Sequence, residues 1–149
     1  PDPLWSRGLG DVYKRQIPSG SGTEVLKRAY CHNWGGGGPA KTYIDWSATD
    51  GETDGNQATA TATRVPANVI LTILNIVVVR YNGSGSTFNL MIEHASNDNI
   101  YLLDSQSIPG NGTFMWNDKI VLHEGDELVF QSAGDENDCW INYIKQDWT

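Results

Sequence analysis

The sequence predicts an all-β fold, a single-domain antiparallel β-sandwich of the jelly-roll kind. Its 149 residues include 16 glycines, six tryptophans and six tyrosines, a composition typical of β structure with many tight turns. Short alternating runs of apolar and polar residues are separated by turn residues about every 8–12 positions. No segment shows the 3.6-residue apolar period of a helix. These three observations favour a sandwich and leave the order of its strands open.

The first three expected strands are short and lie before residue 64. Residues 24–31 are expected to form the first strand. Residues 32–39 follow it, and their four glycines and one proline predict a loop. Residues 41–46 are expected to form a second strand, and the polar residues 47–56 carry two Asp-Gly dipeptides that predict turns. Residues 57–63 alternate between alanine and threonine, which predicts an edge strand or one packed closely against a neighbour.

The strongest strand signal is the β-branched run of residues 69–81, which predicts a central strand buried on much of both faces. Residues 82–85, Asn-Gly-Ser-Gly, then predict a hairpin. The next expected strand, 87–94, points alternate side chains to opposite faces of its sheet. One face receives Phe88, Leu90 and Ile92, and the other receives Thr87, Asn89, Met91 and Glu93.

Five more strands are expected in the second half of the chain. Pro109 opens a glycine-rich turn, and Gly125 with Asp126 marks another. We expect Gly125 to take the positive φ that glycine tolerates, and Asp126 to accept hydrogen bonds from backbone amides of the turn. These turns and an acidic loop at 134–138 separate strands at 100–103, 113–116, 119–122, 127–132 and 139–145.

The charge of the chain restricts its partners. Ten Lys and Arg residues oppose 18 Asp and Glu residues, which gives a formal charge of -8. A protein that neutralises phosphates needs the opposite balance, so we expect no nucleic-acid partner. No apolar run reaches the length of about 18 residues that a transmembrane helix needs, so we expect no membrane partner.

Residues 1–16 differ from the rest of the chain. They show neither helical nor strand periodicity, and they lack the apolar core of a signal peptide. Their sequence resembles translated adapter sequence, so we interpret them as a non-native or disordered segment before a sandwich domain at 17–149. The alternative is a genuine arm that packs on a neighbouring subunit.

Four motifs in a fixed order resemble a known family. They are Val-Pro-Ala at 65–67, Ile-Pro-Gly-Asn-Gly at 108–112, Lys-Ile-Val-Leu at 119–122 and Glu-Gly-Asp at 124–126. The set resembles small β-sandwich structural proteins of tailed bacteriophages, especially those of marine viruses. The resemblance covers residues 65–148 well and the preceding residues from 23 loosely.

This resemblance implies a non-enzymatic component of a virion. The implied roles are a capsid decoration (cement) protein or an accessory of the collar, tail or fibre. Major capsid or tail proteins are the implied partners, and we expect a homo-oligomer, with a trimer favoured. The protein would join the virion during assembly in the cytoplasm of the bacterial host.

No catalytic signature accompanies this interpretation. The sequence lacks the Gly-x-Ser-x-Gly elbow of many hydrolases and the His-Glu-x-x-His motif of zinc proteases, so we expect neither enzymatic activity nor a cofactor. His94 and His123 end strands beside Glu93 and Glu124, an arrangement that permits a two-strand metal site. Surface histidines near turns, His32 included, are the favoured interpretation.

Two acidic loops carry carboxylates of the kind that calcium prefers. One contains Asp135, Glu136 and Asp138, and the other contains Asp50, Glu52 and Asp54. The second begins like an EF-hand loop but lacks a carboxylate at its far end and flanking helices. We favour two solvated acidic loops without metal.

Cys31 and Cys139 lie in the first and last expected strands, which can be neighbours in a sandwich. A disulfide between them would close a long loop. Because bacterial cytoplasm keeps thiols reduced, we favour two buried thiols.

The aromatic residues divide into two groups. We expect Phe88, Phe130 and Trp140 in the core, because they alternate with polar neighbours. Tryptophans in loops commonly anchor protein interfaces or stack on sugar rings. The expected interface residues are Trp34, Trp116, Trp148 and Tyr30. A protein interface is the first interpretation, and a carbohydrate-binding tail-fibre or lectin-like module is the alternative.

Overall fold

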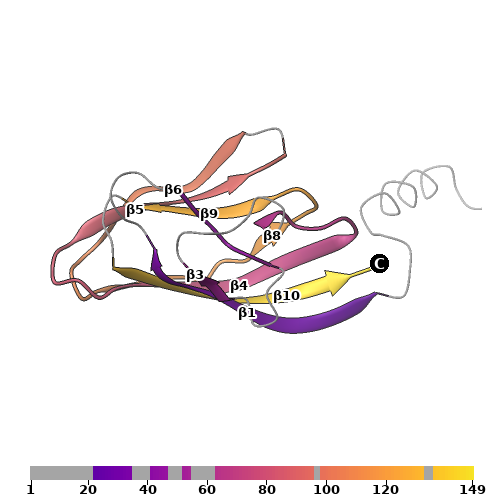
Figure 1. Ribbon diagram of the computed structural model, residues 1–149, viewed down its shortest axis with the longest axis horizontal. Helices are drawn as coiled ribbons and strands as arrows, with labels where there is room; N and C mark the ends of the chain where they lie inside the picture. The colour runs from indigo at the N-terminus through magenta and orange to yellow at the C-terminus, as the bar shows by residue number, and fades with distance from the viewer. Residues whose placement is uncertain (1–21, 35–40, 47–51, 55–62, 96–97, 133–135) are drawn as a thin grey trace, which may run out of the picture.

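The first and last strands of the fold lie side by side in one sheet of a two-layered sandwich (Figure 1). This computed structural model describes residues 22–34, 41–46, 52–54, 63–95, 98–132 and 136–149. Within these ranges strands are the predominant structure and form two sheets, which confirms the predicted β-sandwich. No helix among the described residues is long and apolar enough to cross a membrane. The segment 1–16 lies outside the described residues.

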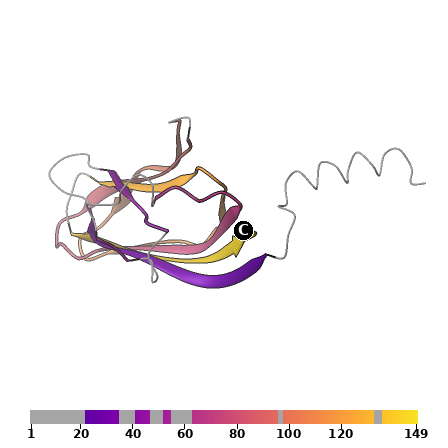
Figure 2. The same ribbon diagram turned by 45° about the vertical axis from the view of Figure 1, so that its right-hand side comes forward.

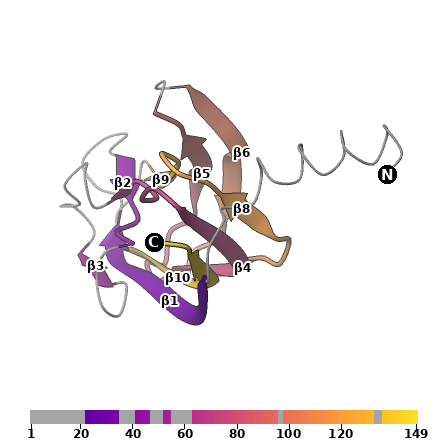
Figure 3. The same cartoon turned by 90° about the vertical axis from the view of Figure 1, so that its right-hand side faces the viewer.

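The described residues form ten strands arranged in two sheets. Their bounds are β1 Thr23–Trp34, β2 Lys41–Tyr43, β3 Glu52–Asp54, β4 Val69–Arg80, β5 Ser86–Glu93, β6 Asn99–Ile108, β7 Thr113–Trp116, β8 Ile120–Leu122, β9 Glu127–Ser132 and β10 Asn137–Asp147. The larger sheet has the order β3-β1-β10-β4-β7, with β8 also paired to β4, and the smaller sheet has the order β2-β9-β5-β6. All pairs are antiparallel except β1 with β3. Figures 2 and 3 show the two layers from other directions.

The strand β4 lies at the centre of the larger sheet, between β10 on one side and β7 with β8 on the other. Its residues alternate between buried and half-buried up to Leu74, where the alternation shifts by one position. The register with β10 shifts at the same place, because Asn142 pairs with Asn75 and Tyr143 pairs with Ile73. Leu74 is therefore the extra residue of a β-bulge. The outward side of β4 is half-buried, so burial on both faces is less complete than expected.

The core fills the space between the two sheets. The larger sheet contributes aliphatic residues of β4 and alternate residues of β1 and β10, among them Ala29, Cys31, Cys139, Ile141 and Tyr143. The smaller sheet contributes Phe88 and Leu90 of β5 and Leu128 and Phe130 of β9. This period-two pattern places each strand's apolar face inward.

Part of the smaller sheet is buried on its outer face as well. Met91 and Val129 pair directly and are fully buried, yet neither belongs to the core between the sheets. Just before the start of β9, Val65 donates its backbone N–H to the carbonyl of Asp126 and accepts from the N–H of Gly125, and its side chain belongs to the core between the sheets. Gly125 has a φ of 85°, the left-handed conformation expected for it.

Two turns at one end of the sandwich make close contact. The turn after β6 begins at Pro109, whose carbonyl accepts from the N–H of Gly112 at 3.0 Å. The next residue of this turn, Gly110, has its backbone against Gly83, and a Cβ placed on Gly110 would lie 2.0 Å from the Gly83 carbonyl oxygen. Only glycine fits at position 110.

Several sequence expectations are wrong in their details. The strand β3 lies in the stretch 47–56, where only turns were expected, and β6 extends to Ile108 rather than ending at residue 103. The strand β2 ends at Tyr43, three residues early. Of the expected alanine–threonine strand, only Thr63 is described, and it lies outside the strands.

Candidate binding surface

The exposed side of the larger sheet carries a row of apolar and aromatic side chains across four strands. Directly paired residues point to the same side of a sheet, and here Tyr30 of β1 pairs with Trp140 of β10, Trp140 with Val77 of β4, and Val77 with Met115 of β7. Trp140 is 39% exposed and Met115 is 57% exposed. We call this side of the larger sheet the outer face.

A second row crosses the outer face near its other end. Leu26 of β1 pairs with Ile144 of β10, which pairs with Thr72 of β4, and Thr72 pairs with Val121 of β8. Leu26 is 70% exposed and Val121 is 49% exposed. The outer face therefore presents large apolar side chains to solvent at both ends.

Polar side chains between the two rows hold the aromatic row in place. The amide of Asn142 donates to the Oδ1 of Asn75 at 2.8 Å, and the indole N–H of Trp140 donates to the Oδ1 of Asn142 at 3.2 Å. The Arg28 guanidinium lies 5.4 Å from the centre of the Trp140 ring, a cation–π contact. The Tyr30 and Trp140 rings stack at 5.6 Å with an angle of 13° between their planes.

An open pocket of about 330 Å³ lies beside this stack. Tyr30 and Trp140 line one part of it, Val77 and Val79 line the part over β4, and the His32–Asp138 pair lines another part. The His32 Nδ1 and the Asp138 Oδ1 lie 2.8 Å apart, and the His32 ring stacks on Tyr81. The pocket thus combines apolar walls with a hydrogen-bonding pair, a combination suited to binding.

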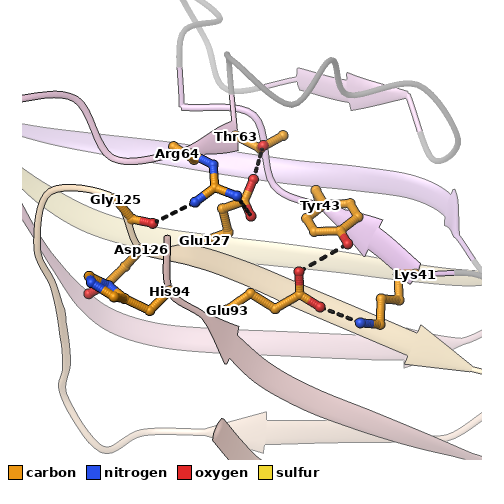
Figure 4. A network of polar contacts seen from close by, with 9 residues as sticks. All are labelled: Lys41, Tyr43, Thr63, Arg64, Glu93, His94, Gly125, Asp126 and Glu127. Carbon is orange, nitrogen blue, oxygen red and sulfur yellow. Dashed lines mark hydrogen bonds and ion pairs between the residues drawn. The ribbon is translucent and has the colours of Figure 1, made fainter. Parts of the chain in front are cut away.

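A separate polar network lies on the outer side of the smaller sheet (Figure 4). Glu93 of β5 and Glu127 of β9 are direct cross-strand partners, and both side chains are buried. Like charges in such positions repel each other. Glu93 compensates by pairing with Lys41 and by accepting from the Tyr43 hydroxyl at 3.1 Å.

Glu127 has its own set of partners in this network. It accepts from the Thr63 hydroxyl at 2.5 Å, and the Arg64 guanidinium lies 3.3 Å away. Arg64 also donates to the carbonyl oxygen of Gly125 at 3.3 Å.

Burial, together with the hydrogen bond to Glu93, raises the pKa of Tyr43 from 10.0 to about 12. The network joins β2, β5, β9 and the segment before β4, so we assign it a structural role.

Two histidines near this network, His94 and His123, both contact the carboxylate of Asp126. The His94 Nδ1 lies 2.6 Å from the Asp126 Oδ1, while the Asp126 Oδ2 accepts from the backbone N–H of His123 at 2.9 Å. Asp126 therefore accepts within its turn as expected. No group of three or more His, Cys, Asp or Glu side chains in the described part of the chain could hold a metal ion.

The acidic loop before β10 contributes contacts within the protein. Glu136 accepts from the amide of Asn82, and its backbone carbonyl accepts from the N–H of Tyr81. Asp138 pairs with His32. Asp135 and the side chains of residues 50, 52 and 54 lie outside the described residues.

The structure separates the four expected interface residues. Tyr30 lies on the outer face, whereas Trp116 ends β7, at the end of the strand expected at 113–116, and packs, half-buried, against the core. Trp148 is half-buried, and its indole lies so close to Gly22 that a Cβ on that residue would be 2.7 Å from Nε1. Trp34 ends β1, and its side chain lies outside the described residues.

The expectation that Trp140 belongs to the core is also wrong. Cys139, Ile141 and Tyr143 point inward from β10, so Trp140 and Asn142 point outward. The sequence itself indicates the outward position of Trp140. Alternate residues of a strand point to the same side, so Trp140 lies on the same side as Asn142, and asparagine is rarely buried in a core. The two cysteines do point inward, and both are buried free thiols.

Comparisons with known proteins leave the family of this chain open. No protein-family model matches the sequence, and no curated protein matches it. Among solved structures, the chain is similar to the CBM22-1 xylan-binding domain of Xyn10C from Paenibacillus barcinonensis, with 8% identity, a TM-score of 0.36, and coverage of 89% of this chain and 99% of that one.

The chain is also similar to a second solved structure, the isomalto-dextranase of Arthrobacter globiformis T6 complexed with panose. It is 20% identical with a TM-score of 0.28. The match covers 87% of this chain and 24% of that one, so this chain spans about a quarter of its length.

Proposed function

We propose that this chain is a non-enzymatic structural protein that attaches to other proteins through the outer face. The observation that supports this most directly is the exposure of Leu26, Met115, Val121 and Trp140 in two rows across the larger sheet. Large exposed apolar side chains grouped on one face are typical of interaction surfaces. Tryptophan, tyrosine, methionine and arginine are the residue types enriched in protein interfaces, and the outer face contains all four.

The sequence motifs extend this proposal to a virion. Their resemblance to phage β-sandwich proteins favours a role in capsid decoration. In this role a homo-oligomer, with a trimer favoured, would bind over coat or tail subunits. Binding to the assembled shell and not to its dissociated subunits would stabilise the shell by mass action. The acidic charge of the chain would keep it soluble and away from packaged nucleic acid.

The test mixes the purified protein with undecorated shells of the cognate phage and measures co-sedimentation and the temperature at which the shells break. We expect the wild-type protein to sediment with the shells and to raise that temperature. The variant Leu26→Lys/Met115→Lys should weaken binding by at least about tenfold, because it places charges in both apolar rows.

A matched control variant distinguishes the outer face from a general effect of added charge. Ile100→Lys/Tyr101→Lys places the same two charges at exposed positions of β6, in the other sheet. It should bind as the wild type does. Failure of the wild type to bind shells would overturn the decoration role, and equal weakening by both variants would overturn the assignment of the surface.

A second candidate function is carbohydrate binding by the open pocket. The observation that favours it is the Tyr30–Trp140 stack beside the His32–Asp138 pair, since aromatic rings stack on sugars and polar side chains fix their hydroxyls. A glycan array run with and without chelator tests it. Binding of one glycan class that Trp140→Ala abolishes and Leu26→Lys leaves intact would favour this candidate, and binding lost with chelator would indicate calcium.

A further inference from the structure

The two cysteines of the chain face each other across the seam between β1 and β10. Cys31 and Cys139 are direct partners in the antiparallel register, and they are 1% and 3% exposed. Direct partners point to the same side of a sheet, so both thiols point into the core between the sheets. Both thiols are free in this structure.

Direct partners in an antiparallel pair have Cα atoms about 4.5 or 5.5 Å apart, depending on their place in the ladder. Disulfides form between residues whose Cα atoms are about 4.4–6.8 Å apart. We propose that Cys31 and Cys139 form a reversible disulfide that joins the first and last strands when the protein meets an oxidising environment. This proposal goes beyond the proposed binding function and does not depend on it.

The oxidant that we assign to this step is a small disulfide of the glutathione type. The thiolate of one cysteine attacks the small disulfide, which forms a mixed disulfide and releases one glutathione thiol. The second cysteine, after losing its proton, attacks the mixed disulfide and releases the second glutathione thiol. The two protein thiols are oxidised, one glutathione disulfide is reduced to two thiols, and the two protons of the protein thiols end on them.

Burial limits the rate of this exchange in the folded protein. Burial, with the hydrogen bond to Cys31, raises the pKa of Cys139 well above its ordinary value. Since the thiolate is the reacting species, the folded protein should oxidise slowly, and faster as the pH rises. Refolding in a glutathione redox buffer should oxidise the pair fully, because the thiols are accessible before the strands close.

The experiment measures intact mass after alkylation of the unfolded protein. Protein purified with reductant should take up two alkyl groups, whereas protein refolded with oxidised glutathione should take up none and be lighter by two hydrogens. The oxidised protein should unfold about 10 °C higher, because the disulfide closes a loop of more than 100 residues. Reductant should abolish this shift.

The single variants Cys31→Ala and Cys139→Ala serve as controls, and neither should show a redox-dependent unfolding temperature. The wild-type mass measurement stands even where a variant fails to fold. Two alkylated thiols after refolding with oxidised glutathione would overturn the proposal. So would a stable glutathione adduct on one cysteine or a disulfide between two chains, because either shows that the pair does not close within one chain.

Discussion

Tyr143 is among the largest fully buried side chains of the protein, and its hydroxyl makes no hydrogen bond to the residues that the structure describes. The ring packs edge-on against Trp46 at 5.1 Å, and the indole N–H of Trp46 is likewise without a described partner. These two polar atoms are buried at a cost that the surrounding apolar contacts offset. Sequence periodicity indicates that Tyr143 points inward, but it cannot show how its hydroxyl is satisfied.

Replacing Tyr143 with phenylalanine should stabilise the protein. The ring and its contact with Trp46 are kept, and a buried hydroxyl without a partner is removed, so we expect a gain of about 1 kcal/mol in the free energy of unfolding. Denaturant titration, monitored by tryptophan fluorescence, measures this gain in the free energy of unfolding. Tyr101→Phe, at an exposed position, should change nothing, and a loss of stability in Tyr143→Phe would show that the hydroxyl has a partner.

The buried carboxylate of Glu127 gives a second prediction at this scale. Glu127→Ala removes the acceptor of the Thr63 hydroxyl and the partner of Arg64, so it should cost about 3 kcal/mol of unfolding free energy. Glu24→Ala removes an exposed contact with Gln146 and should cost no more than about 0.5 kcal/mol. Equal losses in the two variants would contradict the structural role of the network.

At the scale of elements, the sequence predicts strands well where one face is apolar and the other polar. The strands β5 and β10 show this alternation, β4 and β9 are marked instead by runs of apolar residues, and all four lie close to their expected bounds. The strand β3 has no apolar pattern, because its three residues are polar and its pairing with β1 comes from the rest of the fold. The edge strand β6 is exposed along much of its length, so its second half lacks the alternation that would predict it.

The contact between the two turns gives a prediction about elements. Gly110→Ala would place a Cβ 2.0 Å from the Gly83 carbonyl, so the turns must separate, and we expect a loss of about 3 kcal/mol. Gly83→Ala meets only Asn111, at 3.9 Å, and should cost less than about 1 kcal/mol. Thermal unfolding of both variants measures the difference. Similar losses would show that the contact does not hold the turns together.

At the scale of the whole molecule, sequence reasoning identifies the sandwich but not its outer face. The open pocket beside the Tyr30–Trp140 stack combines residues from β1, β4 and β10. These strands lie far apart in the sequence and meet because β10 pairs with both of the others. Of the expected interface residues, Tyr30 belongs to this surface. Strand order depends on long-range pairing, and no local pattern in this sequence encodes it.

The stability of the whole molecule should fall in alkaline solution. Burial raises the pKa of Tyr143 to about 12, and burial with the hydrogen bond to Glu93 does the same for Tyr43, while each phenol in the unfolded chain keeps its value of 10.0. Between these values the folded state holds protons that the unfolded state has lost, so the free energy of unfolding decreases as the pH rises from 10 to 12.

Denaturant titrations across this pH range, with tyrosinate absorbance as a second signal, measure the decrease. The variant Tyr43→Phe/Tyr143→Phe should show a flatter dependence on pH than the wild type. An identical slope in both proteins would contradict the pKa values.

The position of β10 between β1 and β4 also has a consequence for synthesis of the protein. The ribosome makes β1 and β4 long before β10, so the two strands have no common neighbour while the chain grows. Pairing across so large a sequence separation is slow, and unpaired strand edges favour aggregation. A nascent chain that stalls before residue 137 therefore exposes both edges, and chaperones that bind extended apolar segments should retain it until the last strand is released.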